Sequence, residues 1–176
     1  LDHSQMKISI IGLGHVGTTI AYTLMIRGLG KEILLWNRSI NKAKGDALDL
    51  SQAASFTNQP MKIRAGELEE TTNSDVILIS VSAPWREHYT SRFDFTKPNL
   101  DIYKKLIPTL LQLSPQAKFI IISNPVDIMT YICIKHLGIP KQQVLGIGTL
   151  IDSGRFRESL SQLMHIHPDD IRAYVI

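Results

Sequence analysis

Short apolar runs alternate with longer amphipathic segments along most of the chain. The runs predict six buried strands, at residues 6–11, 32–36, 61–64, 76–81, 118–122 and 144–147. Between them, apolar residues spaced three and four apart predict helices over residues 16–27, 41–55, 100–113, 125–137 and 152–164. We expect an irregular loop over 83–94 and an extended segment over 171–176.

Strands that read as continuous apolar runs and alternate with helices predict a parallel sheet with helices on both faces. Right-handed crossovers then favour an α/β doubly wound (Rossmann) fold with strand order 3-2-1-4-5-6. We expect a dinucleotide-binding domain over residues 6–148 and the start of a second, substrate-binding domain over 149–176. Ligands bind such sheets beyond the carboxyl ends of the strands.

Composition and charge narrow the class of protein. The 176 residues are 44% hydrophobic and 20% charged, which is typical of a globular domain, and no apolar stretch reaches the length of a membrane span. The net charge is +3, but the basic residues form no long cluster, so we predict no nucleic-acid partner. The single cysteine, Cys133, is expected to be a buried thiol in a reducing compartment, which favours a cytoplasmic location. We predict no metal site.

A glycine motif follows the first predicted strand. Gly12, Gly14 and Gly17 form G-x-G-x-x-G at the start of a predicted helix. Gly12 allows the turn, Gly14 lets a diphosphate approach the backbone, and Gly17 lets the helix pack closely. The helix N-terminus offers unpaired N–H groups and a positive dipole. The motif predicts a dinucleotide site lined also by the variable motif residues His15 and Val16, with His15 a loop residue and not a catalyst.

The end of the second strand bears on the choice of cofactor. NAD-binding units usually have an acidic residue here that binds the ribose 2′-hydroxyl, but this chain has Asn37, followed by Arg38 and Ser39. An asparagine can bind a hydroxyl and does not repel a phosphate, and Arg38 and Ser39 could bind a 2′-phosphate. Two interpretations stay open. Either Asn37 replaces the acid, NAD is bound and Arg38 is a solvated charge, or the preference is relaxed toward NADP.

Four stretches resemble the lactate/malate dehydrogenase family in order and spacing. They are the glycine motif, KGDALDL at 44–50, SNPVD at 123–127 and GTLIDSGRFR at 148–157, and the resemblance extends over residues 7–176. It implies hydride transfer between NAD(P) and a small 2-hydroxy acid, malate or lactate, with the nicotinamide supplying the chemistry. It also implies a dimer or tetramer assembled through the helices at 41–55 and 152–164.

The resemblance assigns roles to individual residues. Arg155 would bind the substrate carboxylate, and Arg92 would polarise the reacting carbonyl. Asn124 would bond a substrate oxygen, and Asp152 would orient a catalytic histidine. The alternative for Asp152 and Arg155 is a surface ion pair, since they are three residues apart on a helix. The nicotinamide side would be lined by Ser82, Ala83, Asn99, Ile122, Ser123 and Asn124.

The loop after the fourth strand departs from the family. The family generally has an Ala-Gly pair where this chain has Ala83 and Pro84, so the closing motion of the loop is in question. The position that selects the substrate falls on Arg86 when counted back from Arg92 and on Glu87 when counted forward from Ala83. We favour Arg86, because the segment to Arg92 then needs no gap. An arginine there would pair with a second carboxylate and favour malate.

No histidine occupies the position that the family uses for catalysis. That histidine is expected directly after Ile176, and none of the six histidines of the sequence lies at a matching position. We therefore expect these 176 residues to be part of a longer dehydrogenase, or a truncated one, and to be inactive alone. The alternative is a non-catalytic dinucleotide-binding or interaction module derived from the family. Another kind of Rossmann enzyme would leave Asn124, Asp152 and Arg155 unexplained.

Overall fold

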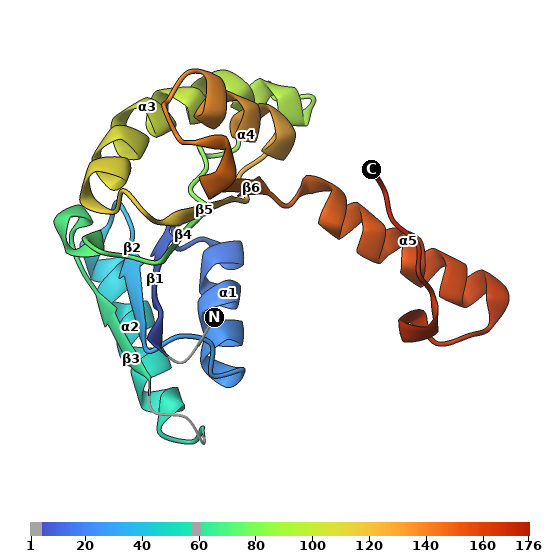
Figure 1. Cartoon of the computed structure of the whole chain (residues 1–176), viewed down its shortest axis with the longest axis horizontal. Helices are drawn as coiled ribbons and strands as arrows, with labels where there is room; N and C mark the ends of the chain where they lie inside the picture. The colour runs from blue at the N-terminus through green and yellow to red at the C-terminus, as the bar shows by residue number, and fades with distance from the viewer. Residues whose placement is uncertain (1–4, 58–60) are drawn as a thin grey trace.

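The computed structural model describes residues 5–57 and 61–176 and contains one six-stranded parallel sheet (Figure 1). The strand order is β3-β2-β1-β4-β5-β6. The strands are β1 (Lys7–Ile11), β2 (Glu32–Trp36), β3 (Lys62–Ala65), β4 (Val76–Ile79), β5 (Lys118–Ile121) and β6 (Val144–Gly146). The predicted fold class and strand order are confirmed.

Two apolar cores lie on the two faces of this sheet. Successive strand residues point to opposite faces, so Ile10 packs with α1 (His15–Ile26) and α2 (Ile40–Ala54), whereas Ile11 packs with α3 (Thr96–Leu113) and α4 (Val126–Lys135). Cys133 lies in the second core, where burial raises the pKa of its thiol to about 12, as expected for a buried cysteine. Short 3-10 helices occur at η2 (Leu68–Thr71), η3 (Arg92–Phe95), η4 (Lys141–Gln143) and η5 (Pro168–Asp170).

The strand register aligns the carboxyl ends of the central strands. Ile11 of β1 lies opposite Trp36 of β2 and Ile79 of β4, and Ile79 lies opposite Ile121 of β5. The segments that follow these strands therefore leave the sheet along one edge. That edge is where a doubly wound fold binds its ligands.

Several predicted boundaries were wrong by a few residues. Helices α3 and α5 (Gly148–Met164) begin earlier than the predicted residues 100 and 152. Residues 96–99 of α3 lack the apolar spacing, whereas α5 begins at a glycine and its first apolar residues, Leu150 and Ile151, are exposed. Pro125, predicted as the first residue of a helix, instead has an extended backbone and caps α4, after a cis Asn124–Pro125 bond. The segment 171–176 has no regular secondary structure.

Helix α5 extends away from the body of the fold, and the following chain runs back beside it (Figure 1). Only Ser153 of this helix is buried, and its Oγ accepts a hydrogen bond of 2.9 Å from the backbone N–H of Val175. Several of its large apolar side chains are exposed: Leu150, Ile151, Phe156, Leu163 and Met164. The domain boundary at residues 148–149 stays a prediction. Within the described ranges, every helix is too short or too polar to cross a lipid bilayer.

Candidate active site

The glycine turn between β1 and α1 is packed too tightly for side chains at two of its glycines. Gly12 has a φ of +101°, and a Cβ there would lie 2.6 Å from the backbone N of Val81. A Cβ on Gly17 would collide with the carbonyl oxygen of Gly12 and lie 2.7 Å from Ser80 Oγ. The Ser80 hydroxyl also donates a hydrogen bond of 2.8 Å to that carbonyl. These contacts fix the turn against the end of β4.

Gly14 occupies a different environment from the other two glycines of the motif. A Cβ built on Gly14 would meet no atom of the described chain within 4 Å. Gly14 caps α1 without a side-chain hydrogen bond, and the first N–H groups of a helix have no partner within it. His15 and Val16, the next two residues, are exposed. The turn therefore presents open space and backbone donors at the positive end of α1, an arrangement that suits a phosphate.

A cavity of about 500 Å³, here called the β2 cavity, lies beyond the end of β2. Asn37 lines it, and the Asn37 Oδ1 accepts a hydrogen bond of 3.4 Å from the backbone N–H of Leu13. The Asn37 Nδ2 donates to the carbonyl of Ser39 at 3.5 Å. The glycine turn and the start of α2 thus orient this amide. The full lining is Trp36, Asn37, Arg38, Ser39, Val81, Ser82, Pro84, Asp101, Ile102, Lys105 and Leu106.

Two more cavities continue along the same edge of the sheet. The central cavity, of about 330 Å³, is lined by Val16, Ser80, Ser82, Arg92, Phe95, Ile122, Ser123 and Asn124. The α5 cavity, of about 440 Å³, is lined by Ser91, Arg92, Phe93, Ile122, Asn124, Pro125, Val126, Asp127, Ile128, Gly148, Ile151, Asp152 and Arg155. Ser82 lines both the β2 and central cavities, and Arg92, Ile122 and Asn124 line both the central and α5 cavities. The three cavities therefore form one crevice.

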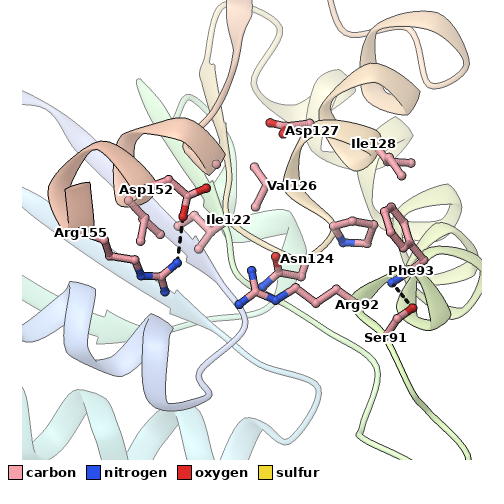
Figure 2. Close-up of a pocket in the computed structure, with 13 residues that line it drawn as sticks. Ser91, Arg92, Phe93, Ile122, Asn124, Val126, Asp127, Ile128, Asp152 and Arg155 are labelled. Carbon is pink, nitrogen blue, oxygen red and sulfur yellow. Dashed lines mark hydrogen bonds and ion pairs between the residues drawn. The ribbon is translucent and has the colours of Figure 1, made fainter. Parts of the chain in front are cut away.

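Two guanidinium groups point into the α5 cavity from different sides, as Figure 2 shows. Arg92 reaches it from η3, beside Asn124, and Arg155 reaches it from α5. Arg155 also forms an ion pair of 2.9 Å with Asp152, and the two side chains are 63% and 53% exposed. The surface ion pair considered for these residues therefore exists, and it lines the cavity. Because a guanidinium carries five N–H donors, Arg155 keeps donors for another anion.

Asn99 of α3 connects the loops that follow β4 and β5. It is fully buried, and its Oδ1 accepts a hydrogen bond of 2.7 Å from the backbone N–H of Ala83. Its Nδ2 donates to the carbonyl of Asn124, also at 2.7 Å. Nearby, the Ser123 hydroxyl donates to the carbonyl of Val81 at 2.5 Å. Asn99 therefore lies among the predicted nicotinamide-side residues, but its amide bonds protein backbone and has no exposed side.

The loop that carries Arg92 is ordered at its base. The Asp94 carboxylate accepts hydrogen bonds from the backbone N–H groups of Ser91, at 2.8 Å, and Thr90, at 2.7 Å. These two bonds lower the pKa of Asp94 below its usual value. The Tyr89 ring packs edge-on against Phe95, with 4.8 Å between the ring centroids. Arg92 therefore begins η3 from a capped, partly packed segment.

The tip of the same loop lies outside the crevice. Arg86 and Glu87 are exposed and line none of the three cavities. The Arg86 carbonyl accepts a hydrogen bond of 2.9 Å from Tyr89, which closes a turn. The structure therefore does not bring Arg86 to Arg155, and the selection of substrate by Arg86 stays a prediction.

Sequence reasoning missed several residues of the crevice. On α3, the side chains of Asp101, Ile102, Lys105 and Leu106 line the β2 cavity. Their spacing of one and four places them on a single helix face, but nothing in the sequence shows that this face meets the end of β2. Ser80, in contrast, follows β4 with no motif to mark it. Among the described residues, no histidine lines the three cavities, and no three His, Cys, Asp or Glu side chains are grouped to hold a metal.

Comparison with known sequences gives a consistent result. The sequence model of the lactate/malate dehydrogenase NAD-binding domain matches residues 6–146. The chain is 42% identical over 170 residues to an L-lactate dehydrogenase of Thermoanaerobacter sp., covering 97% of this chain and 54% of that protein. It is 40% identical over 171 residues to an L-lactate dehydrogenase of Synechococcus sp., covering 97% and 55%. The chain thus spans about half the length of these relatives.

The chain also matches solved structures of lactate dehydrogenases over nearly its whole length. The crystal structure of lactate dehydrogenase from Eimeria maxima with NADH and oxamate matches with a TM-score of 0.90 and 26% identity, covering 99% of this chain and 53% of that one. The minor L-lactate dehydrogenase from Enterococcus mundtii, in a ligand-bound form, matches with a TM-score of 0.90 and 28% identity, covering 98% and 55%. Both likenesses include nearly all of this chain.

Proposed function

Because the chain belongs to the lactate/malate dehydrogenase family, we propose that it forms the cofactor-binding part of a dehydrogenase that transfers a hydride between a nicotinamide dinucleotide and a small 2-hydroxy acid. The single observation that carries the proposal is that Arg92 and Asn124 line both the central cavity and the α5 cavity. A hydride passes directly between two carbons, so cofactor and substrate must meet. The wall shared by these cavities is such a meeting place.

The cofactor would lie along the crevice in an extended conformation. The adenosine would occupy the β2 cavity, the diphosphate would lie on the turn at Gly14, and the nicotinamide would enter the central cavity between Ser82 and Asn124. NAD(H) is the expected cofactor of the family domain. The proposal extends to NADP(H), because Asn37, Arg38 and Ser39 replace the usual acidic residue.

The substrate would lie in the α5 cavity. Arg155 would bind the substrate carboxylate through two N–H donors, and Arg92 would stabilise negative charge that develops on the reacting oxygen. Asn124 would donate a hydrogen bond to that oxygen. Asn99, which bonds the backbone of Ala83 and Asn124, would act as a positioning residue for the walls around the nicotinamide.

Reversible hydride transfer also needs a group that exchanges a proton with the substrate oxygen. Asp152 would orient a histidine for this purpose, as a carboxylate does in a catalytic triad. Among the described residues, however, no histidine lines the crevice, and the Asp152 carboxylate pairs with Arg155. The pairing of Asp152 with Arg155, together with Asn37 and the Ala83–Pro84 loop, favours a second candidate, a dinucleotide-binding module without catalytic activity. We further expect residues 1–176 alone not to turn over substrate.

Assembly is part of the same proposal. We expect an oligomer that uses α2 and α5, and the exposure of Leu48 on α2 and of Phe156 on α5 supports contacts there. Light scattering coupled to size-exclusion chromatography measures the assembled mass. A mass of one chain at micromolar concentration would contradict the expectation.

The function is tested by two assays on the same preparations. Titration of NADH with the chain, followed by nicotinamide fluorescence, should show saturable binding. Oxidation of NADH with oxaloacetate or pyruvate is then measured on the full-length gene product and on residues 1–176. Turnover by the former supports the dehydrogenase, whereas binding without turnover in both supports the non-catalytic module. Absence of saturable binding of both NADH and NADPH would contradict both.

A further inference from the structure

The lining of the β2 cavity carries more positive than negative charge. Two cationic side chains line it, Arg38 from the segment after β2 and Lys105 from α3. Within residues 5–57 and 61–176, neither side chain forms an ion pair. The one carboxylate in the lining is Asp101, and it pairs with Lys97 at 3.5 Å. The cavity therefore holds two cations that lack an anionic partner.

The position that normally carries a carboxylate is neutral. Asn37 occupies it, and its amide is oriented by bonds to Leu13 and Ser39. A carboxylate at this place binds the 2′-hydroxyl of the ribose, and its negative charge would repel a 2′-phosphate. With Asn37 in its place, the repulsion is absent, while the charge of Arg38 and Lys105 favours a dianion.

We propose that Arg38 and Lys105 together form a subsite for the 2′-phosphate of NADP(H), so that this chain selects NADP(H) over NAD(H). The inference rests on the proposed function, since it takes the β2 cavity as the place of the adenosine. The proposed subsite includes Lys105 in addition to Arg38. No sequence motif marks Lys105, and it reaches the cavity from a different element than Arg38. A guanidinium from one element and an ammonium from another can engage one phosphate from two directions.

The test compares the dissociation constants of NADPH and NADH for the chain and three variants. The unmodified chain should bind NADPH at least about tenfold more tightly than NADH, since one hydrogen bond to a charged group contributes that much or more. Lys105→Gln should weaken NADPH binding by about tenfold and leave NADH binding within about twofold. Lys104→Gln is the matched control, because Lys104 is the exposed neighbour on α3 and does not line the cavity. It should change neither constant.

Asn37→Asp tests the effect of placing a carboxylate at the neutral position. The added carboxylate should reverse the preference, so that NADH binds more tightly than NADPH. The subsite is ruled out if the unmodified chain binds NADPH no more tightly than NADH, or if Lys105→Gln weakens both cofactors equally. Binding of neither cofactor would instead contradict the proposed function. Because all variants change polar, solvent-accessible side chains, retained NADH binding reports that they are folded.

Discussion

The two sides of the crevice are held in place by different means. On the proposed cofactor side, which comprises the glycine turn and the β2 and central cavities, Gly12 and Gly17 pack against the end of β4. The buried Asn99 bonds two loops together on the same side. On the proposed substrate side, which is the α5 cavity, Arg155 is 63% exposed on a helix that extends from the body, and the loop tip with Arg86 lies outside the crevice. The cofactor side therefore takes its shape from the core of the domain. The α5 side is held by fewer buried contacts, since Ser153 is the one buried residue of α5.

The sharpest contrast comes from matched glycine substitutions on the two sides. Gly17→Ala should lower the free energy of unfolding by about 3 kcal/mol, because its Cβ overlaps the backbone of the turn. It should also abolish saturable NADH binding. Gly154→Ala on α5 meets no described atom within 4 Å, so it should leave the stability unchanged or raise it by up to about 1 kcal/mol. Urea denaturation measures both. Equal losses would show that α5 is packed as tightly as the turn.

Asn99 tests whether the cofactor side depends on buried hydrogen bonds. Asn99→Ala leaves the N–H of Ala83 and the carbonyl of Asn124 without partners, and should cost about 2 kcal/mol of stability. Asn99→Asp keeps the acceptor for Ala83 but turns a second acceptor toward the carbonyl of Asn124 in a fully buried site, so it should cost at least as much. A positioning role further predicts that Asn99→Ala weakens NADH binding under conditions where the variant is fully folded. Unchanged NADH affinity would reduce Asn99 to a stabilising residue.

Arg86 tests the substrate side through selectivity. Arg86→Gln in the full-length gene product should lower the ratio of kcat/KM for oxaloacetate to that for pyruvate by about tenfold, through loss of one charged contact. Glu87→Gln, the neighbouring substitution, should leave the ratio within about twofold if Arg86 is the selecting residue. If Glu87→Gln changes the ratio and Arg86→Gln does not, then Glu87 occupies the position that selects the substrate.

The smallest expected effect concerns Asp94, at the base of the loop that carries Arg92. Hydrogen bonds from Ser91 and Thr90 depress the pKa of Asp94, so the capping is complete above the carboxyl's unfolded pKa and is lost as the pH falls through its folded pKa. The amide NMR signals of Thr90 and Ser91 should therefore shift during acid titration, with a midpoint below that of a free aspartate. Asp94→Asn should abolish this transition. A midpoint at the ordinary value would mean that the cap is not formed in solution.

Features that repeat locally along the chain could be predicted from the sequence, whereas contacts between distant segments could not. Buried strands carry a continuous apolar signal, so the sheet order followed from periodicity and crossover rules, and the glycine motif located the turn. The helix starts at Thr96 and Gly148 were missed because Pro98 and Gly148 lie in these first turns, and both residue types are typical of loops. The role of Asn99 as a bridge and the presence of Lys105 in the β2 cavity depend on contacts between segments distant in sequence. A single sequence states no such contacts.

A crystal structure of the chain with bound NADH would show where each part of the dinucleotide lies. We expect adenosine in the β2 cavity, the diphosphate on the turn at Gly14 and the nicotinamide beside Asn124, within reach of Arg92. A diphosphate bound away from that turn, or a nicotinamide outside the central cavity, would contradict it.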